Sequence, residues 1–151
     1  MGRGYFGIGI YKPKTTVNIG TLWRSAHNMG ADFLFTISHR YYKQPSDTGW
    51  ACRHVPMFHY TDWQDFLNHL PAGCDVVVVE QFDCSRDLAE FVHPESCVYV
   101  LGAEDYGVPE DLALGHQKVK IKTLRCLNVA VAGSIVMYDR MTKRGVEVRI
   151  G

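Results

Sequence analysis

The stretch Asp75-Val-Val-Val-Val-Glu80 decides the fold of this chain. Its four consecutive valines are β-branched and apolar, so they favour a strand with no face left for water. Such a strand is typical of a parallel sheet that helices cover on both sides. The run Ser96–Leu101 (Ser-Cys-Val-Tyr-Val-Leu) has the same character. We therefore expect two buried strands of a parallel sheet.

Strand and helix patterns alternate outward from these two runs. Further strands are predicted at Tyr5–Tyr11, Phe33–Ser38, Val55–Tyr60 and Lys118–Ile121, and helices at Val17–Met29, Thr61–Leu70, Asp87–Phe91 and Val129–Met141. Thr61 is the expected N-cap of the second helix, and residues 39–49 predict a loop. Strands separated by helices require right-handed crossovers. We therefore predict a three-layer α/β/α fold with a mainly parallel sheet, formed by residues 1–151 as a single domain.

The composition is that of a soluble globular protein, because 46% of the 151 residues are hydrophobic and 21% are charged. No apolar run approaches the roughly 20 residues of a membrane span, and the N-terminus lacks a secretory pattern. We therefore expect a cytoplasmic protein that makes no membrane contact. Five scattered cysteines argue against a disulfide framework or a zinc site, and the seven histidines form no metal-binding pair, so no metal is expected.

The charges balance, with 16 basic and 16 acidic residues. Zero net charge does not favour nucleic-acid binding unless the basic residues gather on one face. Lys118, Lys120 and Lys122 alternate, so in an extended strand they would point the same way. They fit either a nucleic-acid-binding surface or a solvated edge strand that lysine protects from aggregation. Both interpretations stay open at this point.

A loop bracketed by glycines follows the buried strand at 96–101. Ligands of doubly wound sheets bind at the carboxyl ends of the strands, and Gly102 and Gly107 let the backbone approach a ligand closely. Pro109 suits the first turn of a following helix. The loop has neither the G-x-G-x-x-G nor the G-K-[ST] pattern, which disfavours a phosphate-binding nucleotide site.

Two further segments carry a polar residue on or at the start of a predicted helix. Asn128 stands among apolar residues and is expected first of all to cap the last helix. The small residues after it would let a flat ligand approach, although a tightly packed core helix explains them equally well. Arg24, on the first helix, is by itself typical of a surface arginine.

Taken together, the three segments resemble the three motifs of the SpoU/TrmH family of RNA 2′-O-ribose methyltransferases, within the SPOUT superfamily. The first, Asn-x-Gly-x-x-x-Arg-Ser/Thr, is matched by Asn18, Gly20, Arg24 and Ser25. The second, apolar-Gly-x-Glu-x-x-Gly, is matched by Leu101, Gly102, Glu104 and Gly107. The third, Ser-Leu-Asn-Val-Ser/Ala-x-Ala, is matched by Leu127, Asn128, Val129, Ala130 and Ala132, with Cys126 where serine is usual. The resemblance spans almost the whole chain.

The resemblance implies a C-terminal trefoil knot and S-adenosylmethionine bound in the knotted loops. Carried over by position, the cofactor contacts fall on Val79, Glu80, Leu101, Gly102, Gly107, Ile121, Cys126, Leu127 and Ala130. A thiol donates hydrogen bonds more weakly than a hydroxyl, so Cys126 would weaken any side-chain contact there. The family also implies a homodimer. An apolar stripe on the last helix, made of Val129, Ile135, Val136 and Met137, exceeds what one core face needs.

The activity implied is methyl transfer to a ribose 2′-OH of RNA, with tRNA favoured for so short a chain and rRNA as the other substrate. Carried over by position, the catalytic residues are Arg24, Asn18, Glu104 and Asn128, and the RNA contacts are Arg24, Ser25, Lys12 and Lys14. A guanidinium is a poor general base, so we expect Arg24 to clamp a phosphate and stabilise the developing alkoxide. Glu104 would either orient that arginine or cap a helix near Pro109.

Three other functions compete with this one. The first is a non-catalytic RNA-binding module that keeps the fold, which the intact Arg24, Glu104 and Asn128 argue against. The second is an oxidoreductase with a nucleotide cofactor, which the absent glycine fingerprint disfavours. The third is a methyltransferase that acts on a protein or a small molecule, and the methyl acceptor distinguishes it.

Overall fold

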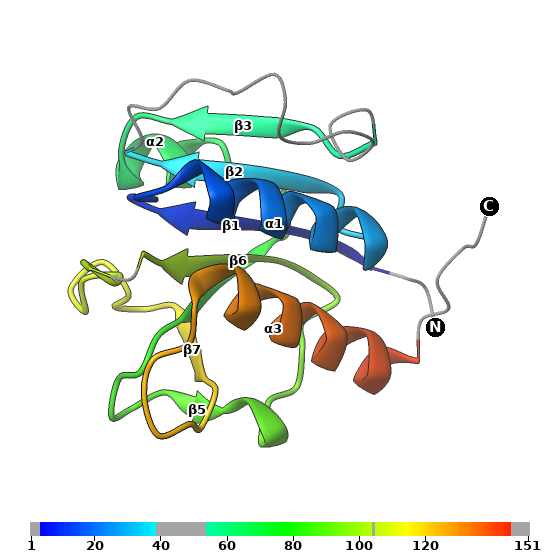
Figure 1. Ribbon diagram of the computed structural model, residues 1–151, viewed down its shortest axis with the longest axis vertical. Coiled ribbons are helices and arrows are strands. Elements are labelled where there is room, and N and C mark those ends of the chain that lie inside the picture. The colour runs from blue at the N-terminus through cyan, green and yellow to red at the C-terminus, as the bar shows by residue number, and fades with distance from the viewer. Residues whose placement is uncertain (1–3, 39–53, 104, 146–151) are drawn as a thin grey trace.

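The computed structural model describes residues 4–38, 54–103 and 105–145. Within these segments, seven strands form one sheet in the order β3-β2-β1-β6-β4-β7-β5 (Figure 1). The strands are β1 (Tyr5–Tyr11), β2 (Phe33–Ile37), β3 (Met57–Tyr60), β4 (Asp75–Val79), β5 (Arg86–Asp87), β6 (Ser96–Gly102) and β7 (Gln117–Lys120). Each neighbouring pair runs parallel. The expected parallel α/β sheet is confirmed.

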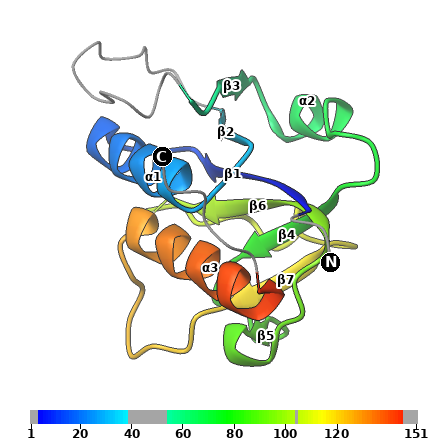
Figure 2. The ribbon, with the colours of Figure 1, turned by 90° about the vertical axis from the view of Figure 1, so that its right-hand side faces the viewer.

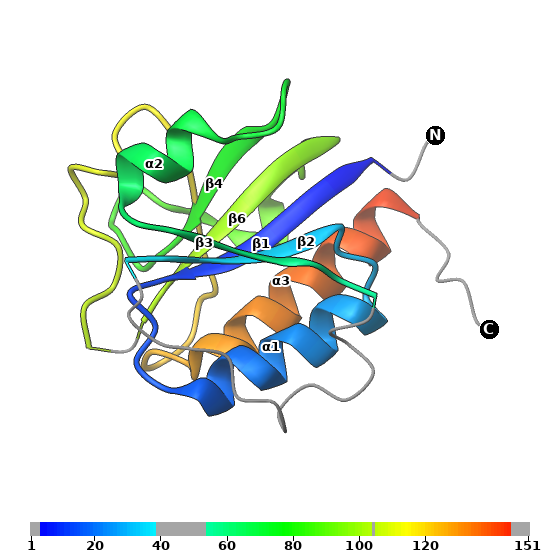
Figure 3. The ribbon, with the colours of Figure 1, turned by 90° about the horizontal axis from the view of Figure 1, so that it is seen from above.

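Helices and turns cover both faces of this sheet. The helices α1 (Thr16–Asn28) and α3 (Val129–Arg144) lie next to each other on one face, as Figure 2 shows. The short helix α2 (Trp63–Asn68) lies on the other face (Figure 3). The buried apolar residues divide accordingly into a cluster under α1 and α3 and a cluster under α2 and the 108–113 turns. The three-layer arrangement is therefore confirmed.

The valine run of β4 lies inside the sheet, between β6 and β7. Val77 and Val79 belong to the cluster under α1 and α3, and Val76 and Val78 belong to the cluster under α2. Successive side chains of a strand point to opposite faces, so a strand buried on both sides needs an apolar residue at every position. This requirement explains why four valines in a row predict the position of β4.

The second helix begins later than expected. Its N-cap is Asp62 rather than Thr61, and the Asp62 carboxylate accepts a hydrogen bond of 2.8 Å from the backbone N–H of Asp65. Threonine and aspartate both serve as N-caps, so two adjacent candidates are hard to separate from sequence. The helix predicted at residues 87–91 is instead the two-residue strand β5 followed by a single 3₁₀ turn, Leu88–Glu90.

Two further expectations are wrong, and two stay predictions. After Pro109 the chain forms successive turns rather than a helix. The lysine-rich strand β7 is not an edge strand, because β5 pairs with it, and Lys122 lies beyond its end, so the three lysines do not form one strand face. The predicted loop at 39–49 lies outside the described residues. The trefoil knot stays a prediction.

A buried polar network fixes the end of α3 to the sheet. Arg140 is only 2% exposed, and its guanidinium donates to two backbone carbonyls just before β6, both at 2.7 Å, and to the Tyr99 hydroxyl at 3.0 Å. His93 lies 2.7 Å from that hydroxyl through Nδ1 and 2.7 Å from the Asp139 carboxylate through Nε2. Burial lowers the pKa of His93. We therefore assign a neutral ring that accepts from Tyr99 and donates to Asp139.

Within residues 4–38, 54–103 and 105–145, no helix is both long enough and apolar enough to cross a membrane.

Candidate functional site

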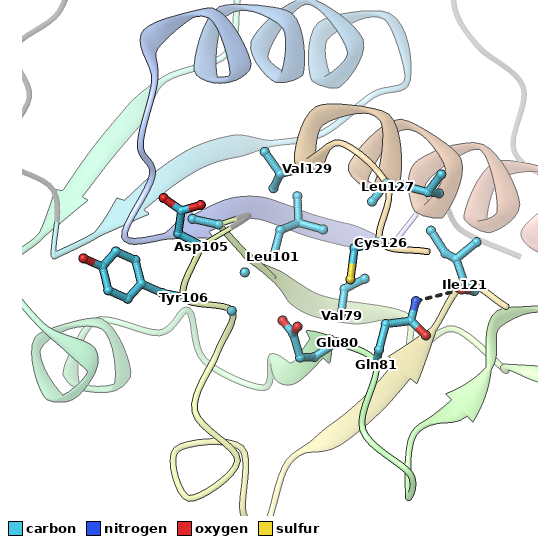
Figure 4. A pocket seen from close by; sticks show the side chains of 14 residues that line it. Val79, Glu80, Gln81, Leu101, Asp105, Tyr106, Ile121, Cys126, Leu127 and Val129 are labelled. Atoms are coloured by element: carbon cyan, nitrogen blue, oxygen red, sulfur yellow. Dashed lines mark hydrogen bonds between the residues drawn. The ribbon is translucent and has the colours of Figure 1, made fainter. Parts of the chain in front are cut away.

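A cavity of about 250 Å³ opens at the carboxyl ends of β4 and β6, where α3 begins (Figure 4). This is the edge at which parallel α/β sheets bind ligands, because the strands end there and their loops diverge. Eight of the nine residues expected to contact a cofactor line it: Val79, Glu80, Leu101, Gly102, Gly107, Ile121, Cys126 and Leu127. Segments far apart in the sequence therefore meet at one place.

Ala130 is the exception among the nine. It is fully buried in the core under α1 and α3 and does not line the cavity. Val129 and Ala132 line it instead. These two residues are three apart, so they lie on one face of α3, whereas Ala130 is turned by about 100° from Val129 toward the sheet. The motif locates the start of the helix correctly, but only the helix phase decides which of its residues face the ligand space.

Other lining residues carry no motif of their own. They are Gln81, Ala103, Asp105 and Tyr106. Gln81 donates through Nε2 to the backbone carbonyl of Ile121 at 2.7 Å, which ties the loop after β4 to the loop after β7. The last three lie inside the Gly102–Gly107 loop, so the glycine bracket is the signal that could have identified them.

The glycines of this loop are required by close packing against Glu80. A Cβ atom on Gly102 would lie 2.3 Å from the Glu80 carboxylate and 2.6 Å from the Cα of Gly107, both too close for any side chain. Gly107 has a φ of +62°, a left-handed conformation that favours glycine. Its backbone N–H donates to the Ala103 carbonyl at 2.8 Å. The loop therefore folds tightly over the carboxylate.

Glu80 places a carboxylate in the cavity wall, and Figure 4 shows it directed into the open space. Burial raises the pKa of this carboxyl, and hydrogen bonds from the backbone N–H groups of Val108 and Gln81 oppose the shift. The Val108 bond measures 3.2 Å. A half-buried carboxylate in a cavity wall suits a positively charged ligand.

Asn18 and Asn128 bring the first and third motifs together. Asn128 caps α3, as expected, because its Oδ1 accepts from the backbone N–H groups of Ala130 at 2.9 Å and Val131 at 3.2 Å. Its Nδ2 donates to Oδ1 of Asn18 at 2.9 Å. Asn18 also lines a small hollow that shares Ala103 with the main cavity, so the asparagine pair lies at the cavity's edge.

Ser25 lies between the two helices rather than at the cavity. Its Oγ is 2.8 Å from Oγ of Ser134 on α3. Asn18 and Ser25 are seven residues apart and so share one face of α1, the face that meets α3. Arg24 points away from that face, is exposed, and is not among the residues lining the cavity. Glu104 lies outside the described residues.

Lys12 and Lys14 lie at the rim of the cavity, just after β1. Lys14 forms an ion pair of 2.5 Å with Asp105, and both side chains are largely exposed. The Lys12 ammonium lies 5.5 Å from the ring centre of Tyr11 and 5.5 Å from that of Tyr106. Two of the three cations expected to meet RNA, Lys12 and Lys14, therefore lie beside the second motif.

Cys126 replaces the serine that is usual in the third motif. Its thiol is exposed, and Figure 4 shows the sulfur directed into the cavity. The side chain therefore faces the ligand space. Any polar contact to it there is weaker than a serine would make.

The sequence of the chain matches a known protein family. A family model described as the SpoU rRNA Methylase family matches residues 6–138. No curated protein sequence matches the chain.

Solved structures resemble the chain closely in fold. A structure on the 2-OH methylation of C/U34 on tRNA has a TM-score of 0.82 and 24% identity, covering 96% of this chain and 100% of that one. The SpoU methyltransferase AviRb from Streptomyces viridochromogenes, in complex with AdoMet, has a TM-score of 0.79 and 19% identity, covering 95% and 62%. The A. aeolicus TrmH/SpoU tRNA modifying enzyme has a TM-score of 0.79 and 21% identity, covering 93% and 75%. At these identities the likeness concerns the fold.

Proposed function

The chain belongs to the SpoU rRNA methylase family, and from this premise we propose that it transfers a methyl group from S-adenosylmethionine to a ribose 2′-OH of RNA. The observation that carries the proposal is the cavity at the carboxyl ends of the strands, where the second and third motifs meet. Its position, its glycine-bracketed loop and its carboxylate all suit this cofactor.

The cavity residues fit S-adenosylmethionine in charge and shape. The cofactor carries a positively charged sulfonium, which the Glu80 carboxylate in the cavity wall would attract. Gly102 and Gly107 let the loop backbone come close to a flat base, and apolar Leu101, Ile121 and Leu127 would cover it. When bound, the cofactor supplies the methyl group. The residues that would hold the cofactor therefore already surround one cavity.

The chain's own polar residues are assigned to the substrate side. As the new carbon–oxygen bond forms, the bond between sulfur and the methyl carbon breaks and the ribose hydroxyl releases its proton to solvent water, so a fixed positive charge beside the oxygen stabilises the developing alkoxide. We assign this role, and a grip on the adjacent phosphate, to Arg24. Asn18 and Asn128 would orient the reacting groups by hydrogen bonding, and Glu104 would orient Arg24.

The preferred substrate is tRNA. The chain covers the full length of the structure on 2-OH methylation of C/U34 on tRNA, which supports this preference, and rRNA is the other candidate. Lys12, Lys14 and Ser25 are assigned to RNA contact, with Lys12 and Lys14 best placed because they lie at the cavity rim. Ser25 would act indirectly, by holding α1 against α3.

A homodimer is part of the proposal, although the apolar stripe differs from the one expected. Val129, Val136 and Met137 are buried in the core, and the exposed apolar residues of α3 are Val131 (46%), Ile135 (38%) and Tyr138 (59%). Their spacing of four and three residues places them on one face of the helix. Pairing of this face with a second copy would bury it, and a closed two-fold dimer is the commonest oligomer.

The dimer would also give Arg24 its position. Arg24 is exposed and outside the lining of its own cavity, so the partner's Arg24 is the one we assign to each site. We further propose that residues 1–151 act as a single methyltransferase domain in the cytoplasm.

The test is incubation with labelled S-adenosylmethionine and total RNA, followed by mapping of the modified nucleotide. Label in a ribose of tRNA or rRNA is the expected result. Calorimetry should show binding of the cofactor or its demethylated product without added metal. A folded protein that binds neither compound would rule the proposal out, and label on protein or on a small molecule would replace RNA as the substrate.

A further inference from the structure

Tyr106 is an exposed aromatic side chain at the rim of the cavity. Its residue is 71% exposed, although it also contributes to the cavity wall (Figure 4). Among the described residues that line the cavity, it is the only aromatic one. A tyrosine ring that is largely open to water beside a ligand site is a ready contact surface, because much of its flat apolar ring stays accessible.

The turn after β1 places the Lys12 side chain beside Tyr106. Lys12 follows the last residue of β1 and adopts a φ of 50°, a conformation that residues other than glycine rarely take. Its backbone N–H donates to the Ile37 carbonyl at 2.8 Å, which helps to hold this turn in place. The side chain then places its ammonium 5.5 Å from the ring centre of Tyr106. A cation and an open aromatic ring are thereby paired at the rim.

The pair lies on the side of the cavity toward α1. Lys14 joins the same rim through its ion pair with Asp105, the neighbour of Tyr106. The hollow that contains Lys14 and Asn18 borders the main cavity through Ala103. An RNA chain that presents its ribose to the cavity from this side would pass the ring and both lysines.

We propose that Tyr106 stacks on a base of the RNA at or next to the methylated nucleotide, while Lys12 binds the adjoining phosphate. Bases of single-stranded RNA are recognised by stacking on aromatic side chains, and lysine is a common phosphate contact. This inference rests on the proposed RNA methyltransferase function. It adds a positioning residue for the substrate that none of the three motifs contains as a fixed position.

The role differs from cofactor binding, and kinetics separate the two. Tyr106→Ala removes the stacking surface, so the KM for RNA should rise by about ten- to a hundredfold while the Kd for S-adenosylmethionine stays at the wild-type value. Tyr106→Phe and Tyr106→Trp keep a flat ring and should keep the KM near wild type. Leu114→Ala is the matched control, because Leu114 is 69% exposed and does not line the cavity.

The experiment is steady-state methyl transfer to the mapped RNA substrate, with cofactor affinity measured by calorimetry and RNA affinity by fluorescence anisotropy. Weaker RNA binding in Tyr106→Ala, rescued by Phe and Trp, is the supporting result. A wild-type KM in Tyr106→Ala, with an active wild-type enzyme, overturns this inference alone. A loss of cofactor affinity in Tyr106→Ala assigns the ring to the cofactor and also overturns it. If the wild-type protein neither transfers methyl groups nor binds RNA, the proposed function fails and the inference with it.

Discussion

The side chain of Asn128 donates to that of Asn18 at 2.9 Å, across 110 positions of sequence. The same Asn128 side chain accepts from the first backbone N–H groups of α3. One amide therefore both caps a helix and fixes the orientation of a second amide at the cavity edge. The two functions use different atoms, so they can be separated by substitution.

Asn128→Asp should separate capping from orientation. Aspartate caps a helix about as well as asparagine, but it cannot donate to Asn18. We expect stability near wild type with reduced methyl transfer. Asn128→Ala should lose both functions and about 0.5–2 kcal/mol of stability. Urea unfolding and single-turnover transfer measure the two effects, and full turnover in Asn128→Asp would show that the contact with Asn18 plays no part in the reaction.

Arg24→Ala should abolish methyl transfer and leave cofactor affinity nearly unchanged. Arg24 lies outside the cavity lining, and the loss of one stabiliser of developing charge costs about a hundred- to a thousandfold in rate. Arg24→Lys should rescue poorly, because an ammonium cannot make a planar two-pronged contact with phosphate. Transfer assays and calorimetry measure the two effects, with the exposed Arg86→Ala as the control. Lost cofactor binding in folded Arg24→Ala would move this residue into the cofactor site.

Glu80→Gln should change the dependence of stability on pH. Burial raises the folded-state pKa of this carboxyl above its ordinary value of 4.5. The folded protein then holds the proton more tightly than the unfolded chain, so the wild type loses stability as pH rises from 4.5 through the raised pKa. Glu80→Gln has no titrating carboxyl at this position, so its free energy of unfolding should rise relative to that of the wild type over this pH range. Above the raised pKa, the difference between the two proteins should stay constant. Urea unfolding from pH 4 to 8 checks this, with the exposed Glu110→Gln as control; a difference that does not vary with pH contradicts it.

Tyr99→Phe should destabilise the protein by about 1–3 kcal/mol. It keeps the ring, which packs against Phe6, but removes the hydroxyl that Arg140 and His93 both bond, leaving buried polar groups unsatisfied. The network lies at the amino end of β6, away from the cavity, so cofactor affinity should not change. Chemical unfolding and calorimetry measure the two quantities. Tyr5→Phe, at a more exposed tyrosine, is the control, and an equal loss of stability in both variants would count against the network.

Ile135→Asp should convert the dimer to monomers and abolish activity. A buried charge in the centre of the exposed face of α3 would prevent its pairing with a second copy. Sedimentation at micromolar concentration measures the mass, and Val92→Asp, at an exposed apolar residue before β6, should stay dimeric. A monomeric wild-type protein would refute the dimer.

Mixing two inactive variants tests the position of Arg24 in that dimer. Cys126→Trp would fill the cavity, and Arg24→Ala would remove the guanidinium. If each site uses the partner's Arg24, mixed dimers contain one complete site and recover part of the activity. No recovery after confirmed subunit exchange would place Arg24 in the site of its own chain.

The elements with strong periodicity were predictable from sequence. The valines of β4 and the apolar residues of α1 can be buried in only one arrangement. The bounds of this strand and this helix were therefore predicted nearly to the residue. The short elements were not, because β5 and the turn Leu88–Glu90 contain too few residues for any period to appear. Their structure depends on pairing with β7, which a local pattern does not contain.

The residues of the candidate site were likewise predictable only in part. The motifs located the cavity because its backbone turns demand particular residues, as at Gly102 and Gly107. The motifs did not show that Ala130 is buried in the core while Ala132 lines the cavity, because this difference depends on how α3 is rotated against the sheet. The glycine bracket marked the loop that contains Tyr106 but not Tyr106 itself, because an exposed aromatic residue in a loop follows no period and becomes informative only when its neighbours in space are known.

Gly133, on the buried face of α3, also affects the size of the cavity. A Cβ atom there would lie 2.6 Å from a methyl carbon of Leu22 and 2.8 Å from one of Leu101. Leu101 forms part of the cavity wall. Added volume at Gly133 would press on that leucine, so the absence of a side chain at this buried position of α3 helps to set the room available in the cavity. A larger residue at position 133 would narrow the cavity without contacting the ligand that binds there.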